Sequence, residues 1–491
     1  MDMPARTLVA PKLPVERNLF FDGRWQAPQG GSFQDTFNPA TGETITAVAS
    51  AGAADVDLAV EAARRAFPAW RDLKPTARGR LLRLAADALR EHAEELAMLD
   101  ALNTGNPVAE MVKDVETAAE GLEFFAGVAT ETKGETIPFG PAHLNYTMRE
   151  PLGVVARVVA YNHPLMFAAM KIGAPLAAGN VVIVKPPEQA PLSGIRMAEL
   201  LGRIFPPGVL NVLSGGRECG QALATHPGVA KISLIGGVET GKAVMRSAAD
   251  TLKPVLLELG GKNALIAYPD ADIEALVPGI IKGMNFFWAG QSCGSTSRVF
   301  LHDSLHDAVL ERLPGAIAER HRPGVPTDWS TTMGPLISQA QYDKVMKYIA
   351  LGVSEGARLV TGGRKCTTPE LANGFYVEPT VFADVQHGMR IAREEIFGPV
   401  LSVFRWHDEE DLFRIVNDVD YGLTASIWTQ NLSRAHKAAA RVQAGYIWIN
   451  NSSSHFLGAP FGGFKQSGLG REECFEEMLE FTQIKNVNVT L

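Results

Sequence analysis

The sequence contains only four cysteines among 491 residues, and their spacing indicates neither a metal site nor a disulfide framework. They are Cys219, Cys293, Cys366 and Cys474. No two of them form a CxxC pair, and no cluster of cysteine and histidine has the spacing of a zinc site. So few cysteines in a long chain favour a reducing compartment. We therefore expect a cytoplasmic protein without a structural metal.

The sequence also lacks long hydrophobic runs and an excess of basic residues. No apolar run approaches the roughly 18 residues that cross a bilayer, and residues Met1 to Arg17 lack the apolar stretch of a secretory signal. Lysine and arginine number 46 against 54 acidic residues, which gives a net charge of −8. Such mild acidity gives no reason to expect nucleic acid or a membrane as a partner.

The composition that remains is that of an ordinary globular protein, with 46% hydrophobic and 20% charged residues. At about 150 residues per domain, the length predicts two to four domains. We find no internal repeat and no low-complexity linker, so the domains can be interleaved along the chain.

Hydrophobic periodicity predicts an α/β fold. Helices are expected over about 55–70, capped by Asp55, and over about 76–103, with Gly105 as the C-cap. From residue 151, short β-branched runs alternate with helical stretches, which predicts a parallel sheet covered by helices. A second alternating block covers about 263–450, and a terminal strand is expected near Val487. The predicted strands of the first block cover 154–159, 181–184, 209–213, 231–235 and 255–258, and its helices lie near 165–176, 192–204, 216–225 and 241–251.

Two residues have sequence surroundings that suit covalent catalysis. Cys293 is flanked by small residues in Gly290–Gly294, which would leave its sulfur accessible, although a buried structural thiol is the commoner fate of a free cysteine. Glu258 ends an apolar run, where burial would raise its pKa and suit it as a general base. An acid at the solvated end of a strand is an equally good interpretation of Glu258.

Three further segments follow predicted strands and have polar or glycine-rich character. Gly236, Gly237 and Gly241 lie at a strand-to-helix turn of the kind that binds phosphates, although their spacing is not GxGxxG. Lys185 and Glu188 flank two prolines. Glu188 suits a ribose diol, although a solvated loop is the favoured interpretation of this segment taken alone. Asn162 can donate to an oxyanion, or it can cap a helix before Pro164. We interpret its neighbour His163 as structural, because no second acid–base group lies nearby in the sequence.

Taken in order, these segments resemble the NAD(P)-dependent aldehyde dehydrogenase superfamily of the hydrolytic type, from about Leu19 to the C-terminus. Tyr161 and His163 replace two aromatic residues of the family pattern, and Gly237 stands at its usual serine. The motifs that carry the resemblance are Tyr161-Asn162-His163-Pro164-Leu165, Lys185-Pro186-Pro187-Glu188, Ile235-Gly236-Gly237-Val238-Glu239-Thr240-Gly241, Leu257-Glu258-Leu259-Gly260-Gly261-Lys262, Gly290-Gln291-Ser292-Cys293, Glu394-Glu395-Ile396-Phe397-Gly398-Pro399-Val400 and Pro460-Phe461-Gly462-Gly463.

The resemblance implies a role for each of these residues. Cys293 would attack the aldehyde, Asn162 would stabilise the oxyanion, and Glu258 would activate the water that hydrolyses the thioester. Relatives that pass the acyl group to coenzyme A typically lack that acid. Glu188 would favour NAD over NADP, because a carboxylate repels a 2′-phosphate. The implied cofactor contacts are Lys185, Glu188, Gly216, Gly236, Gly237, Gly241, Leu259, Glu395 and Phe397.

Alignment to the family also implies which residues line the aldehyde site. Met170 stands where relatives that act on an acidic semialdehyde carry an arginine, and where betaine-aldehyde enzymes carry an aromatic residue. We therefore expect an apolar or aromatic aldehyde as the substrate. The implied lining residues are Phe167, Met170, Phe287, Trp288, Ser292 and His455.

The resemblance implies a Rossmann-like cofactor domain, an α/β catalytic domain and a small β oligomerisation element. The cofactor domain would comprise 1–130 and 151–259, the catalytic domain 260–450, and the oligomerisation element 131–150 with 476–491. A homodimer or homotetramer is expected. Two rivals remain, a non-catalytic family member kept as a structural protein and a thiol hydrolase that uses Cys293 without redox chemistry.

Overall fold

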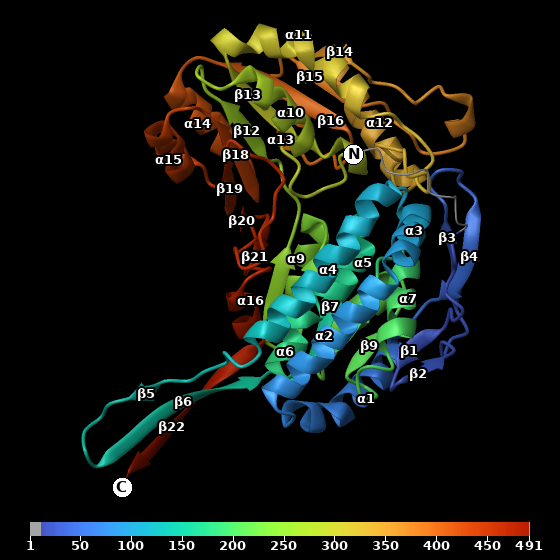
Figure 1. The fold of residues 1–491 in the computed structure, drawn as a ribbon, viewed down its shortest axis with the longest axis vertical. Coiled ribbons are helices and arrows are strands. Elements are labelled where there is room, and N and C mark those ends of the chain that lie inside the picture. The colour runs from blue at the N-terminus through green and yellow to red at the C-terminus, as the bar shows by residue number, and fades with distance from the viewer. Residues whose placement is uncertain (1–10, 491) are drawn as a thin grey trace.

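The computed structural model describes residues 11–490. Residues 1–10 and Leu491 lie outside the described part. The first ten residues belong to the expected cofactor domain and to the segment in which we expect no secretory signal. Figure 1 shows two α/β bodies, built around separate sheets, and a narrow β arm that projects from the first body.

The first body is built on an eight-stranded sheet with the order β2-β1-β9-β8-β7-β10-β11-β21. Its five central strands are parallel, and their order along the chain is 3-2-1-4-5, the arrangement of a doubly wound sheet. The strands are β1 (Leu19–Phe21), β2 (Arg24–Gln26), β7 (Val154–Val158), β8 (Val181–Lys185), β9 (Leu210–Val212), β10 (Lys231–Ile235), β11 (Val255–Glu258) and β21 (Gly468–Leu469).

Helices pack around this sheet because its strands are almost continuously apolar. Helices α2 and α4 lie side by side in Figure 1, in front of β7. The helices of this body are α1 (Ala53–Arg71), α2 (Pro75–Glu91), α3 (Ala93–Thr104), α4 (Val108–Val128), α5 (Pro164–Met170), α6 (Gly173–Ala178), α7 (Leu192–Leu201), α8 (Arg217–Thr225), α9 (Val238–Ala249) and α16 (Phe475–Glu480).

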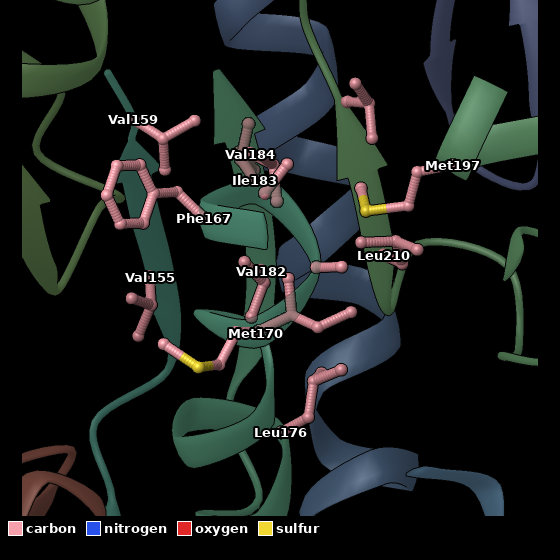
Figure 2. Packing of buried hydrophobic residues seen from close by; sticks show 14 of the residues in the cluster. Val155, Val159, Phe167, Met170, Leu176, Val182, Ile183, Val184, Met197 and Leu210 are labelled. Atoms are coloured by element: carbon pink, nitrogen blue, oxygen red, sulfur yellow. The ribbon is translucent and has the colours of Figure 1, made fainter. Parts of the chain in front are cut away.

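Buried side chains from the central strands and from α5 form the core of the first body. Figure 2 shows Val182 and Val184 of β8 near Phe167 and Met170, which α5 contributes. Because α5 directly follows β7, this packing fixes the loop between them, which carries Asn162.

The second body contains a seven-stranded sheet with the order β14-β15-β16-β13-β12-β18-β19. All its neighbouring strands are parallel except β14 and β15. The strands are β12 (Ala264–Ala267), β13 (Arg298–His302), β14 (Arg358–Thr361), β15 (Thr380–Ala383), β16 (Val400–Trp406), β18 (Thr424–Trp428) and β19 (Tyr446–Ile449). The helices are α10 (Ile273–Met284), η1 (Phe286–Trp288), α11 (Asp303–Arg320), α12 (Gln339–Ser354), η2 (Pro369–Leu371), α13 (Arg390–Arg393), α14 (Glu409–Asn417) and α15 (Leu432–Arg441).

The arm is a three-stranded antiparallel sheet formed by β5 (Thr136–Ile137), β6 (His143–Pro151) and β22 (Thr482–Thr490). Strands β6 and β22 pair along their whole length, from Pro151 with Thr482 to His143 with Thr490. Figure 1 shows the arm projecting away from both bodies. Two small sheets complete the fold, one of β3 (Phe33–Phe37) with β4 (Thr44–Ala49) and one of β17 (Tyr421–Gly422) with β20 (Phe464–Lys465).

The chain returns to the first body after it has completed the second. Strand β21 joins the edge of the first sheet beside β11, and α16 packs against α6. Residues 451–475 were expected in neither the catalytic domain nor the oligomerisation element. Part of this segment, strand β21, packs next to Glu258, which pairs with Gly468. Within residues 11–490, no helix has the length and apolar character needed to cross a membrane.

Several local predictions differ from the structure. The helix expected near 241–251 is α9, which begins at Val238, so Gly241 lies within the helix and not at the turn before it. The single helix expected over 76–103 is two helices that meet at His92, whose imidazole binds Glu95 in the next turn. The helix expected over 165–176 is also divided, because Pro175 has no N–H with which to continue the first helix. Finally, α1 begins earlier than expected. Its N-cap is Gly52, and Asp55 accepts a hydrogen bond from the Gly52 N–H from within the first turn.

Candidate active site

The carboxyl ends of the five central strands bring the predicted residues of the first body together. Strand β7 leads to Asn162, β8 ends at Lys185, and β11 ends at Glu258. Strand β9 is followed by Gly216, and β10 by Gly236. In a doubly wound sheet, ligands bind at this edge, where the strand order reverses. The sheet order therefore places these segments at one site although they are far apart in the sequence.

Cys293 follows a tightly constrained turn after η1. Ala289 and Gly290 both have positive φ, and Gly290 packs against the backbone of Gly398, which leaves no room for a β-carbon. Gln291 holds the loop in place, because its Oε1 accepts from Ile337 N–H at 3.0 Å and its Nε2 donates to the Trp288 carbonyl at 3.3 Å. Gln291 is therefore a structural support for the loop that carries Cys293.

The segment after β11 packs directly on the backbone of Cys293. The side-chain amide of Asn263 donates to the Cys293 carbonyl at 2.6 Å. A β-carbon placed on Gly261 would lie 2.6 Å from the same carbonyl oxygen. These contacts fix Glu258, a few residues earlier, in the vicinity of the Cys293 thiol.

Cys293, which is partly exposed, adjoins the buried Glu258. The two groups are close enough for each to shift the pKa of the other, and the carboxyl oxygen Oε1 of Glu258 is buried without a hydrogen-bond partner among the described residues. Burial, and then the charge of Glu258, raise the pKa of Cys293 well above its ordinary value of 9.0. Burial, and then the charge of Glu472, raise the pKa of Glu258 well above 4.5. A carboxylate that binds protons this readily suits a general base.

Asn162 offers an amide group in the loop after β7, at the same edge of the sheet at which β11 ends with Glu258. Its backbone carbonyl accepts from Asn106 Nδ2 at 2.8 Å, which holds the residue in place. The residue is only 4% exposed, yet its side-chain amide makes no hydrogen bond within the described part of the chain. The amide N–H₂ is therefore available to an oxyanion.

The glycines at the edge of the first sheet leave space of the kind that a dinucleotide requires. A β-carbon on Gly216 would lie 2.9 Å from Glu188 Oε1, so glycine leaves room for this carboxylate. Gly237 is the N-cap of α9 without a side-chain cap, and a β-carbon there would meet nothing within 4 Å. The uncapped N–H groups of α9 thus face open space, which fits a phosphate. Gly241 differs, because its close neighbour is the Leu259 side chain.

The remaining predicted cofactor residues lie on both bodies. Lys185 is buried, and within residues 11–490 its ammonium donates only to the Pro186 carbonyl, at 3.4 Å. Glu395 accepts from the Gly261 N–H at 2.9 Å, and burial raises the pKa of its carboxyl group. The ring of Phe397 packs edge-on against Tyr161 at 5.8 Å between centroids. A carboxylate and aromatic rings from separate segments therefore adjoin the loop that carries Asn162.

The predicted lining residues occupy different environments. Phe287 and Trp288 pack edge-on in η1, with ring centroids 4.9 Å apart. His455 lies among Tyr446 and Phe461, and its Nδ1 is 3.1 Å from Glu473. Ser292 is partly exposed next to Cys293, whereas Phe167 is largely buried. Met170 is only 1% exposed and packs against α4 at Gly121, so it can influence a bound substrate mainly through packing.

The structure shows several residues near the site that the sequence did not indicate. His163 has an acid–base partner in space, Asp114 of α4, which lies 49 positions earlier in the sequence. A buried network also joins Lys171 to Glu472 at 3.0 Å, and its charges act on Glu258. Such pairs are formed by residues from distant helices and loops, and no local spacing signals them.

Comparison with known proteins agrees with this geometry. The family model described as aldehyde dehydrogenase family matches residues 25–487. The chain belongs to the aldehyde dehydrogenase family. It is 55% identical over 487 residues to aldehyde dehydrogenase tropH of Talaromyces stipitatus, which covers 98% of this chain and 94% of that protein. The predicted family and fold class are thereby confirmed.

Solved structures of aldehyde dehydrogenases and related proteins superpose closely on this chain. PnpE from Pseudomonas sp. WBC-3, in complex with nicotinamide adenine dinucleotide, matches with a TM-score of 0.94 and 44% identity over 97% of this chain and 98% of that one. An NAD⁺ complex of aldehyde dehydrogenase from Bacillus cereus also gives a TM-score of 0.94, with 39% identity over 97% of both chains.

Proposed function

We propose that the protein oxidises an apolar or aromatic aldehyde to the carboxylic acid with NAD⁺, through a covalent intermediate on Cys293. The observation that carries this proposal is the interaction of the partly exposed Cys293 thiol with the buried Glu258 carboxyl group, together with a buried Asn162 amide that makes no hydrogen bond within the described residues. A nucleophile, a base and an oxyanion donor are the parts that acyl chemistry requires.

The first half of the reaction uses all three residues. Glu258 takes the Cys293 proton, and the thiolate adds to the aldehyde carbon to give a hemithioacetal. Asn162 donates to the oxygen that becomes negative in this step. A bound NAD⁺ would supply the hydride acceptor. Collapse of the oxyanion then expels hydride from the hemithioacetal carbon and leaves a thioester on Cys293.

Glu258 also serves the second half of the reaction. After the proton taken from Cys293 has left to solvent, Glu258 takes a proton from water and the hydroxide adds to the thioester carbon. The Cys293 thiolate then leaves and recovers that proton from Glu258. The raised pKa of Glu258 supports both roles, because a stronger base removes protons from a thiol and from water more readily. Free carboxylic acid is therefore the expected product, with no requirement for coenzyme A.

NAD is supported as the cofactor by the two solved relatives that were determined with it. We infer that Lys185 and Glu188 hold the adenine ribose and that the N-terminus of α9, at Gly236 and Gly237, holds the pyrophosphate. Glu395 is assigned to the nicotinamide ribose. The carboxylate of Glu188 disfavours NADP, because it repels a 2′-phosphate. Gly216, Gly241, Leu259 and Phe397 are assigned to shaping the same cleft.

The predicted substrate class rests on the residues near Cys293. Phe167, Phe287 and Trp288 supply aromatic surface, and Met170 supplies neither a positive charge for a carboxylate nor an aromatic face for a quaternary ammonium group. Ser292 lies beside the nucleophile, and His455 is assigned to the outer part of the aldehyde site.

We assign residues 1–130 and 151–259 to cofactor binding, 260–450 to catalysis, and 131–150 with 476–491 to assembly into a homodimer or homotetramer. The paired strands β6 and β22 support the last assignment, because they project from the body and expose Ile484 and Leu144. All four cysteines are free thiols, which supports a reducing compartment such as the cytoplasm.

The test measures the oxidation of a panel of aldehydes with NAD and with NADP. Reaction is monitored by the absorbance of the reduced cofactor and by the formation of the carboxylic acid. Benzaldehyde and hexanal should be oxidised with higher kcat/KM than succinic semialdehyde and betaine aldehyde. No gain of NADH absorbance would favour the thiol hydrolase, and no turnover in a folded protein would favour a structural role. Preference for either charged aldehyde would contradict the proposed substrate class.

A further inference from the structure

The buried pair formed by His163 and Asp114 lies beside the catalytic residues but has no part in the proposed mechanism. His163 directly follows Asn162, and Asp114 comes from α4. Their closest atoms, Nδ1 of His163 and Oδ2 of Asp114, are 2.7 Å apart. Both residues are only 6% exposed. A polar pair this deeply buried costs free energy unless it is satisfied, so its position calls for a physical explanation.

The pair touches the residues expected to line the aldehyde site. The His163 ring lies edge-on to Trp288, with centroids 4.3 Å apart, and edge-on to Phe167, at 5.5 Å. The indole Nε1 of Trp288 is buried and has no hydrogen-bond partner among the described residues. The His163 ring likewise makes a hydrogen bond only through Nδ1 within the described part of the chain. Two polar nitrogens on adjoining rings are therefore available.

The two nitrogens have opposite hydrogen-bonding character. In the neutral imidazole, a carboxylate at Nδ1 fixes the proton on that nitrogen and leaves Nε2 as an acceptor. The indole Nε1–H of Trp288 is only a donor. A hydroxyl group can donate to the first and accept from the second. A methyl group can do neither, and an ether oxygen can only accept.

We propose that His163, oriented by Asp114, and Trp288 form a specificity site for a hydroxyl group on the substrate, so that a hydroxylated aromatic aldehyde is preferred. This inference rests on the proposed function and narrows its substrate class. His163 and Trp288 would contact the substrate, and Asp114 acts as a positioning residue. The aromatic contacts of Phe167 and Trp288 suit the ring that carries the hydroxyl group.

The experiment measures kcat/KM of the full-length enzyme with NAD for benzaldehyde, its three hydroxy isomers and the three matching methoxy compounds. At least one hydroxybenzaldehyde should exceed both benzaldehyde and its methoxy counterpart by about tenfold, because a buried polar site discriminates against a substrate that leaves it unpaired. If benzaldehyde and hexanal are oxidised but no hydroxy isomer is preferred, this inference is wrong and the proposed function stands. If no aldehyde is oxidised, the proposed function itself fails.

Variants assign the preference to these residues. His163→Phe and Trp288→Phe keep an aromatic ring and should each reduce the hydroxy-to-methoxy ratio to within about twofold of one. Asp114→Asn should reduce the ratio as well, since an amide does not fix one tautomer of His163. His387→Phe is the matched control, because His387 binds Asp418 at 2.7 Å outside the site. Its ratio should equal that of the wild type.

The ratio separates a specificity role from a structural one. A variant that only loosens the fold lowers kcat/KM for all substrates and leaves the ratio intact. An unchanged ratio in folded His163→Phe would overturn the assignment of the site. An unchanged ratio in Asp114→Asn alone would overturn the positioning role of the carboxylate.

Discussion

The α-carbon of Gly261 approaches the Cys293 backbone so closely that an added β-carbon would lie 2.6 Å from the Cys293 carbonyl oxygen. The same carbonyl accepts a 2.6 Å hydrogen bond from the side chain of Asn263. The end of the first sheet and the nucleophile loop of the second body are therefore held against each other by backbone contact. This contact sets the geometry in which Glu258 meets the thiol.

Substitution of Gly261 should accordingly impair catalysis more than folding. We expect Gly261→Ala to lower kcat by at least about tenfold, because a small displacement of a catalytic group is costly. Gly315→Ala is the control, since a β-carbon there meets nothing within 4 Å on a helix of the second body. Activity equal to the wild type in Gly261→Ala would show that the contact does not position Cys293.

Removal of the carboxylate at residue 258 should stop hydrolysis of the thioester. We expect Glu258→Gln to lower steady-state turnover by about 10²- to 10⁴-fold, which is the range for general base catalysis. Rapid-quench or stopped-flow measurement of NADH then reports any burst that precedes the slowed step. Full turnover in the variant would assign water activation to another group.

The pH dependence of thioester hydrolysis should follow the titration of the Glu258 carboxyl group. Burial raises the pKa of this carboxyl group above 4.5, and only the deprotonated form accepts a proton from water. The hydrolysis rate should therefore fall as the pH decreases through this raised pKa. In the acylated enzyme Cys293 no longer titrates, so single-turnover deacylation isolates the carboxylate. A rate that stays constant from neutral pH down to 4.5 contradicts the raised pKa.

Asn162 should act through the transition state and contribute little to stability. Its amide makes no hydrogen bond within residues 11–490, so Asn162→Ala breaks no side-chain contact of the described fold. We expect kcat to decrease by about 10²- to 10³-fold, as for other oxyanion donors, with a Tm within a few degrees of the wild type. A large loss of Tm with normal kcat would identify Asn162 as a structural cap instead.

Cofactor choice should depend on Glu188, which is exposed beside Gly216. We expect Glu188→Ala to raise the NADP-to-NAD ratio of kcat/KM by about tenfold, because the repulsion between its carboxylate and the 2′-phosphate is removed. Glu410→Ala, which removes a solvent-exposed acid from α14 of the second body, serves as a control for net charge. An NADP efficiency equal to that of NAD in the wild type would contradict the role of Glu188.

The sequence predicted much of the first sheet because buried parallel strands have continuous apolar runs. Strands β10 and β11 lie at the predicted residues, and β7 and β8 differ by a single residue at one end. Polar residues directly after such strands, among them Asn162 and Glu258, were predictable as site candidates because parallel strands end at one edge.

Contacts between distant segments could not be predicted from periodicity. Asp114 faces His163 from a helix 49 positions earlier. The helical pattern of α4 shows on which face of the helix Asp114 lies, but it does not show which residue packs against that face. Strand β21 is too short to give a periodic signal, although it completes the sheet beside Glu258. The break at His92 has no proline or glycine to mark it.

We propose that Cys293 carries the acyl group and that Glu258 directs its hydrolysis. The most direct measurement is mass spectrometry of Glu258→Gln after incubation with benzaldehyde and NAD⁺ at alkaline pH, where hydroxide can take the Cys293 proton in place of Glu258, with peptide mapping of the adduct. A benzoyl group is expected on the peptide that contains Cys293, and none when NAD⁺ is omitted or when Cys293 is replaced by alanine. Acid formation without any adduct on Cys293, or a benzoyl group on another cysteine, would contradict this proposal.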